Sequence, residues 1–233
     1  MTSPRQVAAF HAEYDVHTDD RVRLFRAVAD FVGPTGRVLY PGSYVDVAPS
    51  VWFDDVTYLD IDDRAPRFFD ETDAVDDLVR TKRRALDLPD RSAAIAFHHL
   101  DYREPVPEPD ESFDLLVSLY AGFISEHCTQ HLRVGGTLLV NPSHGDAAMA
   151  SIDPRYELSG VVISGDGDHR ISNSDLETYL IPKKELAVTV ESLHEVGRGV
   201  AYTRSPFAYL FTRSGSATGR ERRGSNVPEP EAW

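Results

Sequence analysis

Two stretches of the sequence decide the fold. Residues 113–118 read Phe-Asp-Leu-Leu-Val-Ser, and residues 132–140 read Leu-Arg-Val-Gly-Gly-Thr-Leu-Leu-Val. The first stretch and the last four residues of the second are apolar runs of a length that predicts buried strands. Between them, Gly122–Leu132 has the pattern of a helix that Gly135 and Gly136 end. A strand, a helix and a second strand in this order form the repeating unit of a parallel sheet.

The same alternation extends in both directions along the chain. Further strands are expected at residues 37–40, 56–59, 93–100 and 207–212, and further helices at 18–32, 67–86 and 189–197. Residues 156–172, centred on a Gly-Asp-Gly-Asp turn, predict an antiparallel hairpin. We therefore predict an α/β protein with a Rossmann-like doubly wound sheet, mostly parallel and ending in an antiparallel C-terminal hairpin.

Residues 18–213 hold this pattern and are expected to form one domain. Residues 1–17 are interpreted as an N-terminal extension. Residues 214–233 consist mostly of Gly, Ser, Pro and charged residues, so they cannot bury enough apolar surface to offset the entropy of ordering, and we predict a disordered tail.

The composition limits the partners. The 233 residues include 38 Asp and Glu against 24 Lys and Arg, a net charge of -14, which disfavours nucleic acid and anionic membrane surfaces. Cys128 is the only cysteine, so an intrachain disulfide and a Cys-rich metal site are excluded. With no apolar run of signal or membrane length, we expect a soluble cytoplasmic protein. The sequence leaves the oligomeric state open.

Five short signatures follow one another at the expected strand ends. In order they are Val-Leu-Tyr-Pro-Gly-Ser (38–43), Leu-Asp-Ile-Asp (59–62), Leu-Asp-Tyr (100–102), Phe-Asp-Leu-Leu-Val-Ser (113–118) and Leu-Arg-Val-Gly-Gly-Thr-Leu (132–138). Their order and spacing resemble the class I S-adenosylmethionine-dependent methyltransferases over roughly residues 18–213. The resemblance implies S-adenosylmethionine as the cofactor and methyl transfer as the activity.

The resemblance also implies cofactor-binding residues. Gly42 and Ser43 would lie in the loop after the first strand, next to the methionine part of the cofactor, where only small residues fit. Asp60, after the second strand, would accept hydrogen bonds from the ribose hydroxyls. An alternative interpretation of Asp60 is a solvated acid that ends a strand in an acidic protein.

Three more positions follow the third and fourth strands. Asp101 and Tyr102 would flank the adenine, the carboxylate accepting from the exocyclic amine, and Ser118 with the residues up to Ala121 would border the sulfonium and the substrate. The alternatives are that Asp101 is a loop acid near Glu104, and that Ser118 is a buried strand residue with a local hydrogen bond.

The first loop departs from the family. The family usually has Gly-x-Gly-x-Gly where this chain has Pro-Gly-Ser-Tyr-Val-Asp at residues 41–46, with one glycine. Tyr44 and Val45 are expected to fit only if the backbone there avoids positive φ. Pro49 and the short segment 46–55 leave little room for a first crossover helix.

The histidines give no convincing metal site. His98 and His99 are neighbours on a strand and point to opposite faces. His127 and His131 stand at i and i+4 on a helix, a spacing that can hold a transition metal, but partner ligands are missing. We therefore predict no metal and interpret these two as part of a solvated helix face.

Residues 141–146, Asn-Pro-Ser-His-Gly-Asp, follow the fifth strand on the same edge as the proposed cofactor. His144 is a candidate general base for a substrate hydroxyl, amine or thiol, and Asp146 a candidate to orient it. The alternative is that Ser143 caps the following helix and that His144 is merely exposed.

The leading hypothesis is thus a methyltransferase acting on a small-molecule acceptor, cationic or neutral in view of the acidic surface. The alternative is a non-catalytic methyltransferase-like binding or regulatory protein, and the altered loop at residues 41–46 supports it. A nicotinamide-dependent oxidoreductase is disfavoured because no Gly-x-Gly-x-x-Gly follows any strand. Residues 54–77 hold ten acids and two bases, so the acidity is concentrated around Asp60.

Overall fold

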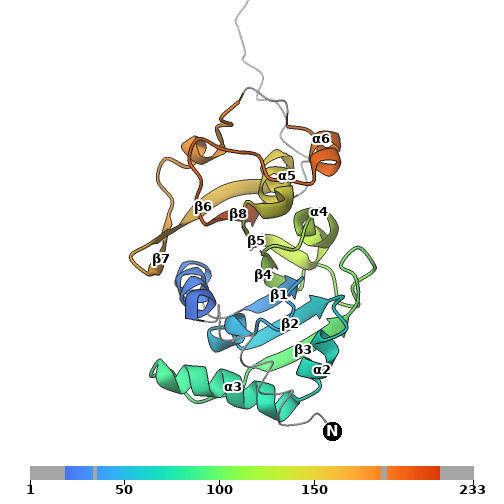
Figure 1. Cartoon of the computed structure of the whole chain (residues 1–233), viewed down its shortest axis with the longest axis vertical. Helices are drawn as coiled ribbons and strands as arrows, with labels where there is room; N and C mark the ends of the chain where they lie inside the picture. The colour runs from blue at the N-terminus through green and yellow to red at the C-terminus, as the bar shows by residue number, and fades with distance from the viewer. Residues whose placement is uncertain (1–18, 34–35, 185–187, 216–233) are drawn as a thin grey trace, which may run out of the picture.

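A twisted sheet of eight strands runs through the part of the chain that the computed structural model describes, residues 19–33, 36–184 and 188–215 (Figure 1). The strands are β1 (Arg37–Pro41), β2 (Asp55–Asp60), β3 (Ala94–His99), β4 (Phe113–Ser118), β5 (Leu132–Val140), β6 (Tyr156–Gly165), β7 (Asp168–Ser172) and β8 (Ala208–Arg213). The predicted extension, residues 1–17, and the predicted tail from residue 216 onward lie outside the described residues.

The strand order is β3-β2-β1-β4-β5-β8-β6-β7. Strands β1 to β5 pair in parallel, whereas β8 inserts antiparallel between β5 and β6, and β6 and β7 form an antiparallel hairpin. The predicted fold class is therefore confirmed. The order reverses between β1 and β4, and in doubly wound sheets ligands bind beyond the carboxyl ends of the strands at such a reversal.

Helices cover both faces of the sheet (Figure 1). They comprise residues 19–32, α2 (Ala65–Phe69), α3 (Thr72–Ala85), α4 (Ile124–Cys128), α5 (Asp146–Ile152) and α6 (Val190–Val196). The first three pack with one apolar cluster, and α4, α5 and α6 with another, so alternate side chains of the central strands serve the two cores. Among the described residues, every helix is too short or too polar to span a bilayer.

The connection from β1 to β2 is short, as its sequence predicts. It contains one 3-10 turn, Ala48–Val51, in place of a crossover helix, and Pro49 lies in the first turn. All four residues of the turn are buried. The connection after β1 is therefore packed into the hydrophobic core at this turn.

The helix predicted at residues 67–86 is two helices in the structure. The chain breaks after Asp70, where Glu71 leaves the helical region with ψ of +57°. Phe68 and Phe69 are both buried, and the Phe69 ring stacks on that of Phe97 at 4.4 Å between centroids. The break allows α2 and α3 each to turn their own apolar residues into the same core, Phe68 and Phe69 from α2 and Val75 and Val79 from α3.

The glycine pair at 135–136 lies inside a strand and does not end a helix. α4 stops at Cys128 and continues as a 3-10 turn, and β5 already starts at Leu132. The pairing with β4 jumps between Leu132 and Thr137, so the intervening residues bulge out. Gly135 has φ of +80°, a conformation that glycine adopts without strain.

Candidate functional site

A cleft of about 390 Å³ opens at the carboxyl ends of β1, β2, β3 and β4. Its volume lies in the range of small-molecule sites. The lining residues are Gly42, Leu59, Asp60, Ile61, Leu100, Asp101, Tyr102, Arg103, Tyr120 and Ala121. The cleft thus brings together four of the predicted cofactor-binding residues, Gly42, Asp60, Asp101 and Tyr102, from three different loops.

The loop after β1 does adopt positive φ at a tyrosine, so the expectation that Tyr44 fits only without it is wrong. Gly42 has φ of +69° and Tyr44 has φ of +48°. The Tyr44 N–H donates a hydrogen bond of 2.6 Å to Asp60 Oδ2. This charge-assisted bond across the cleft edge offsets the steric cost of the left-handed tyrosine.

Asp60 is held by backbone groups on both oxygens. Besides the bond from Tyr44, its Oδ1 accepts from the Asp62 N–H at 2.8 Å. Each carboxylate oxygen has two lone pairs, so each retains one acceptor position. Asp60 is therefore fixed in orientation and still able to accept from a ligand hydroxyl.

Asp101 is more fully occupied. Its carboxylate accepts from the Arg103 backbone N–H at 2.9 Å and from Arg103 Nε and Nη2 at 3.0 and 2.5 Å, and these bonds lower the pKa of Asp101. Tyr102 lies over His127, with 5.7 Å between ring centroids. A Cβ on Gly122 would fall 2.6 Å from the Tyr102 hydroxyl, so the loop after β4 needs glycine at this point.

Ser43 and Ser118 do not line the cleft. Both are buried, at 2% exposure. Ser118 donates to Asp146 Oδ2, and Asp146 Oδ1 also accepts from the Ser125 hydroxyl at 2.5 Å and the Ser125 N–H at 3.1 Å. We call Ser118, Ser125 and Asp146 the buried carboxylate cluster; it joins β4, α4 and α5.

His144 and Asp146 do not form the predicted pair. Asp146 is 1% exposed and faces the two serines of the buried carboxylate cluster, whereas His144 is exposed and its Nδ1 lies 2.6 Å from Ser143 Oγ. Ser143 likewise does not cap α5, because the N-cap residue is Gly145 and receives no side-chain bond. His144 adopts φ of +59°.

Among the remaining histidines of the described residues, His127 and His194 share Glu126 as a partner, and the others contact separate groups. His98 contacts Glu108 at 3.0 Å, and His99 contacts the Ile61 carbonyl at 3.2 Å. His131 is buried, so the prediction of a solvated face is wrong at this residue. Within the described ranges, no group of three or more His, Cys, Asp or Glu side chains is placed to hold a metal.

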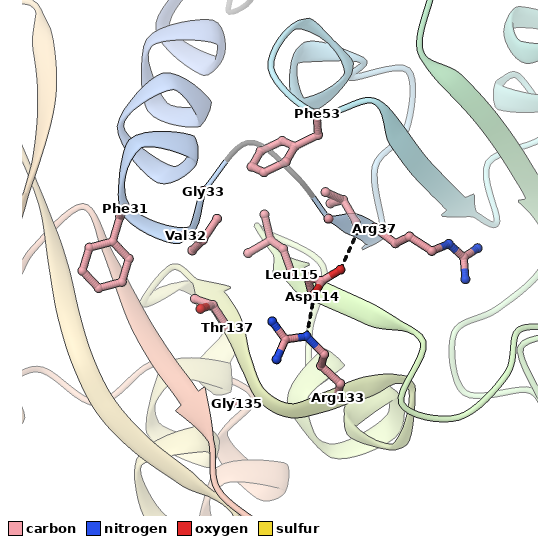
Figure 2. A pocket seen from close by; sticks show the side chains of 12 residues that line it. Phe31, Val32, Gly33, Arg37, Phe53, Asp114, Leu115, Arg133, Gly135 and Thr137 are labelled. Atoms are coloured by element: carbon pink, nitrogen blue, oxygen red, sulfur yellow. Dashed lines mark hydrogen bonds and ion pairs between the residues drawn. The ribbon is translucent and has the colours of Figure 1, made fainter.

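A second cavity, of about 220 Å³, lies at the opposite, amino-terminal end of the strands (Figure 2). At its centre Asp114 accepts from the Arg37 N–H at 2.8 Å and from Arg133 Nε at 2.5 Å. A Cβ on Gly36 would lie 2.8 Å from Asp114 Cβ. These contacts tie the starts of β1, β4 and β5 together, and the cavity lies at the end of the sheet where such folds do not bind cofactors.

Some lining residues were not singled out from the sequence. They are Leu59, Ile61, Leu100 and Arg103. Ile61 is 61% exposed, the highest value among the exposed large hydrophobic side chains of the described residues. An isolated apolar residue inside an acidic run at a strand end is the signal that would have found it.

We predict that Gly42→Ala lowers the unfolding free energy by about 2–5 kcal/mol, because it combines positive φ with overpacking. The new Cβ would lie 2.1 Å from Ala121 Cβ. Gly167→Ala is the matched control, because Gly167 has φ of +76° and nothing within 4 Å of a built Cβ; it should cost only about 1–2 kcal/mol. Chemical denaturation measures both.

Ala121→Gly should rescue part of the loss in Gly42→Ala, since the Cα of residue 121 lies 3.4 Å from the built Cβ. A double-mutant cycle with both single variants measures this coupling. Additive effects would contradict a direct contact between these loops.

Burial raises the pKa of Asp146 to about 6, although its hydrogen bonds with Ser118 and Ser125 oppose the shift. Because the folded-state pKa lies above the unfolded value, this group stabilises the fold most below about pH 4. That contribution, about 3 kcal/mol, is lost as the pH rises to about 6 and above. Asp146→Asn should show a correspondingly flatter stability profile between pH 4 and 7, measured by denaturation. A profile parallel to that of the unsubstituted protein would contradict the shift.

Comparison with known proteins yields similarity of structure only. Neither family models nor curated proteins match the sequence. A SAM-dependent methyltransferase from Thermotoga maritima has 12% identity and a TM-score of 0.46, with 91% of this chain and 97% of that one covered. The 1,6-didemethyltoxoflavin-N1-methyltransferase of Burkholderia thailandensis, solved with S-adenosylhomocysteine, has 14% identity, a TM-score of 0.39 and 92% coverage of both chains.

A candidate S-adenosyl-L-methionine-dependent methyltransferase from Methanococcus maripaludis has 18% identity and a TM-score of 0.37. The match covers 57% of this chain and 61% of the other protein. The likeness to these three solved structures is one of fold.

Proposed function

We propose that the chain is an S-adenosylmethionine-dependent methyltransferase acting on a small-molecule acceptor, with the cofactor in the cleft at the carboxyl ends of β1 to β4. The observation that carries the proposal is the composition of this cleft. Residues that were expected to bind the cofactor from separate signatures, among them Gly42, Asp60 and Tyr102, line one cavity of suitable volume.

The chain's own groups fit the parts of the cofactor. Asp60 is oriented by two backbone N–H groups and keeps lone pairs for the ribose hydroxyls. Ile61 and Tyr102 supply apolar surface for the adenine. Asp101 fits less well, because Arg103 occupies its carboxylate, so its contact with an exocyclic amine requires Arg103 to move.

The cofactor, when bound, supplies an electrophilic methyl group on a sulfonium. The protein then has to align the acceptor and, where needed, take its proton. His144 is our candidate for the proton acceptor, with its ring oriented by Ser143 and not by Asp146. Asp146 acts instead within the buried carboxylate cluster, which holds the end of β4 against α4 and α5.

The non-catalytic alternative rests on the loop after β1. Tyr44 occupies a position where the family usually has glycine, and its N–H uses one acceptor position of Asp60. A protein that binds S-adenosylmethionine and forms no S-adenosylhomocysteine with any of a broad panel of acceptors would support this alternative.

We expect S-adenosylhomocysteine to bind with micromolar affinity, and Asp60→Asn to weaken it about tenfold or more because a charged acceptor is lost. The asparagine retains an oxygen for the Tyr44 N–H and loses the acceptor for the Asp62 N–H, so the loop after β1 should keep its tie to residue 60. Asp63→Asn, at a carboxylate that is 97% exposed, is the matched control and should bind as the unsubstituted protein does. Isothermal titration calorimetry measures all three.

Absence of binding to the unsubstituted protein at millimolar cofactor would refute the proposed function. Equal affinities of the Asp60 and Asp63 variants would refute the role of Asp60.

A further inference from the structure

The loops after β1, β4 and β5 each hold an aromatic residue in the left-handed backbone region. Tyr44, Tyr120 and His144 have φ of +48°, +62° and +59°. The other described non-glycine residues with positive φ are all acidic: Asp87, Glu111, Asp166 and Asp175. Bulky residues keep this conformation only where the surroundings fix it, and such strain gathers at functional sites. These three strained residues therefore lie at the carboxyl-terminal edge of the sheet, where the cleft also lies.

Tyr120 is the one of the three that both lines the cleft and is widely exposed, at 51%. Its backbone N–H donates to Asn141 Oδ1 at 3.3 Å, which ties the loop after β4 to the residue that follows β5. The guanidinium carbon of Arg21 lies 5.0 Å from the centre of the Tyr120 ring. The exposed ring thus adjoins both the cleft and a cation.

Arg21 has hydrogen-bond donors that the described residues do not use. Its side chain is only 19% exposed, and Nη1 is buried without a partner. Arg83, at 2% exposure, donates to backbone carbonyls, whereas Arg23 and Arg213 each also have Nε buried without a partner. Removing a guanidinium from water without giving it acceptors is costly, and Arg21 lies beside the cleft-lining Tyr120, so this arrangement favours an anion supplied from outside the described residues.

The neighbouring Asp46 does not satisfy Arg21. The Asp46 carboxylate lies 3.8 Å from Arg21 Nε, and it accepts hydrogen bonds from the Tyr40 hydroxyl at 3.2 Å and the Ala48 N–H at 3.1 Å. Asp46 thus attracts the guanidinium but provides no acceptor at hydrogen-bond distance, and none of the other described residues does.

We propose that Arg21 and Tyr120 bind the methyl acceptor, and that the acceptor is a small aromatic acid whose carboxylate Arg21 holds and whose ring packs on Tyr120. This inference rests on the proposed function, because it places the acceptor beside the cleft assigned to the cofactor. A guanidinium matches a carboxylate with two parallel N–H···O bonds, and the exposed phenol ring offers a planar apolar surface.

The net charge of -14 opposes the approach of an anion over long distances. It favours a cationic or neutral acceptor, as the sequence indicates. Arg21 acts at contact distance, in a half-enclosed position where the interaction is screened less than on the surface. The Arg21 guanidinium, and not the net charge of the protein, therefore determines the charge of the ligand that binds.

The test uses benzoate, benzamide and benzylamine as probes of equal shape and different charge, titrated by NMR into the full chain with and without S-adenosylhomocysteine. We expect benzoate to bind about tenfold more tightly than benzamide, and benzylamine to bind more weakly still. Arg21→Met should remove the advantage of benzoate over benzamide. Tyr120→Ala should weaken both.

Arg23→Met is the matched control, because Arg23 lies on the same helix and also has a buried nitrogen without a partner, Nε, while its Nη2 donates to Asp20 at 3.4 Å. It should leave all three affinities unchanged, since the ligand is assigned to Arg21 beside Tyr120. Arg21→Lys keeps the charge without the planar fork, should retain part of the benzoate advantage, and serves where Arg21→Met does not fold. Benzoate binding that is unchanged in both Arg21 variants, or tighter binding of benzylamine than of benzoate, overturns the inference.

Cofactor titrations of the same samples separate the two proposals. Normal binding of S-adenosylhomocysteine with benzoate binding that does not depend on Arg21 overturns the acceptor assignment alone. Absence of cofactor binding with Arg21-dependent benzoate binding overturns the proposed function and leaves an aromatic-acid site.

Discussion

The close approach of the loops after β1, β2 and β4 is the constraint on which the cleft depends. Gly42 packs so tightly on Ala121 that no side chain fits between them, and the next turn of the same loop is fastened to Asp60 through the Tyr44 N–H. These two contacts hold the loops after β1, β2 and β4 in place relative to one another. The left-handed backbone of Tyr44 is tolerated because the Asp60 carboxylate accepts its N–H, and this bond offsets part of the cost of that conformation.

Sequence reasoning located the strands and the hairpin because each is encoded locally, by a buried apolar run that ends at turn residues. It also located the loops that meet at the cleft, since the carboxyl ends of parallel strands share one edge. It missed the division of residues 67–86 into two helices and the bulge at Gly135, because both follow from packing between distant segments. Asp146 shows the same limit: its partners Ser118 and Ser125 precede it by 28 and 21 residues, and only the folded chain brings them together.

One feature of the site is encoded by residues close together in the sequence, namely pairs of aspartate and arginine two positions apart. Aspartate and arginine separated by one residue form a closed pair at Asp62 and Arg64 and at Asp101 and Arg103. In each, the carboxylate accepts from the backbone N–H two residues on and from the guanidinium of the same arginine. The Arg64 bonds lower the pKa of Asp62 to about 2. Short-range pairing of this kind takes a carboxylate out of consideration as a free ligand group.

These pairs change what the acidity of residues 54–77 means. Asp54 and Asp55 at the start of β2 contact Arg91 and Arg37, and Asp62 contacts Arg64, so much of the local charge is compensated. Within the described residues Asp60 accepts only from backbone N–H groups, which orient a carboxylate without cancelling its charge. Asp60 is thus an acid that faces the cleft and that no described arginine or lysine compensates. A fixed anion with free lone pairs suits both ribose hydroxyls and the positive charge of a nearby sulfonium, whereas an arginine-paired acid would suit neither.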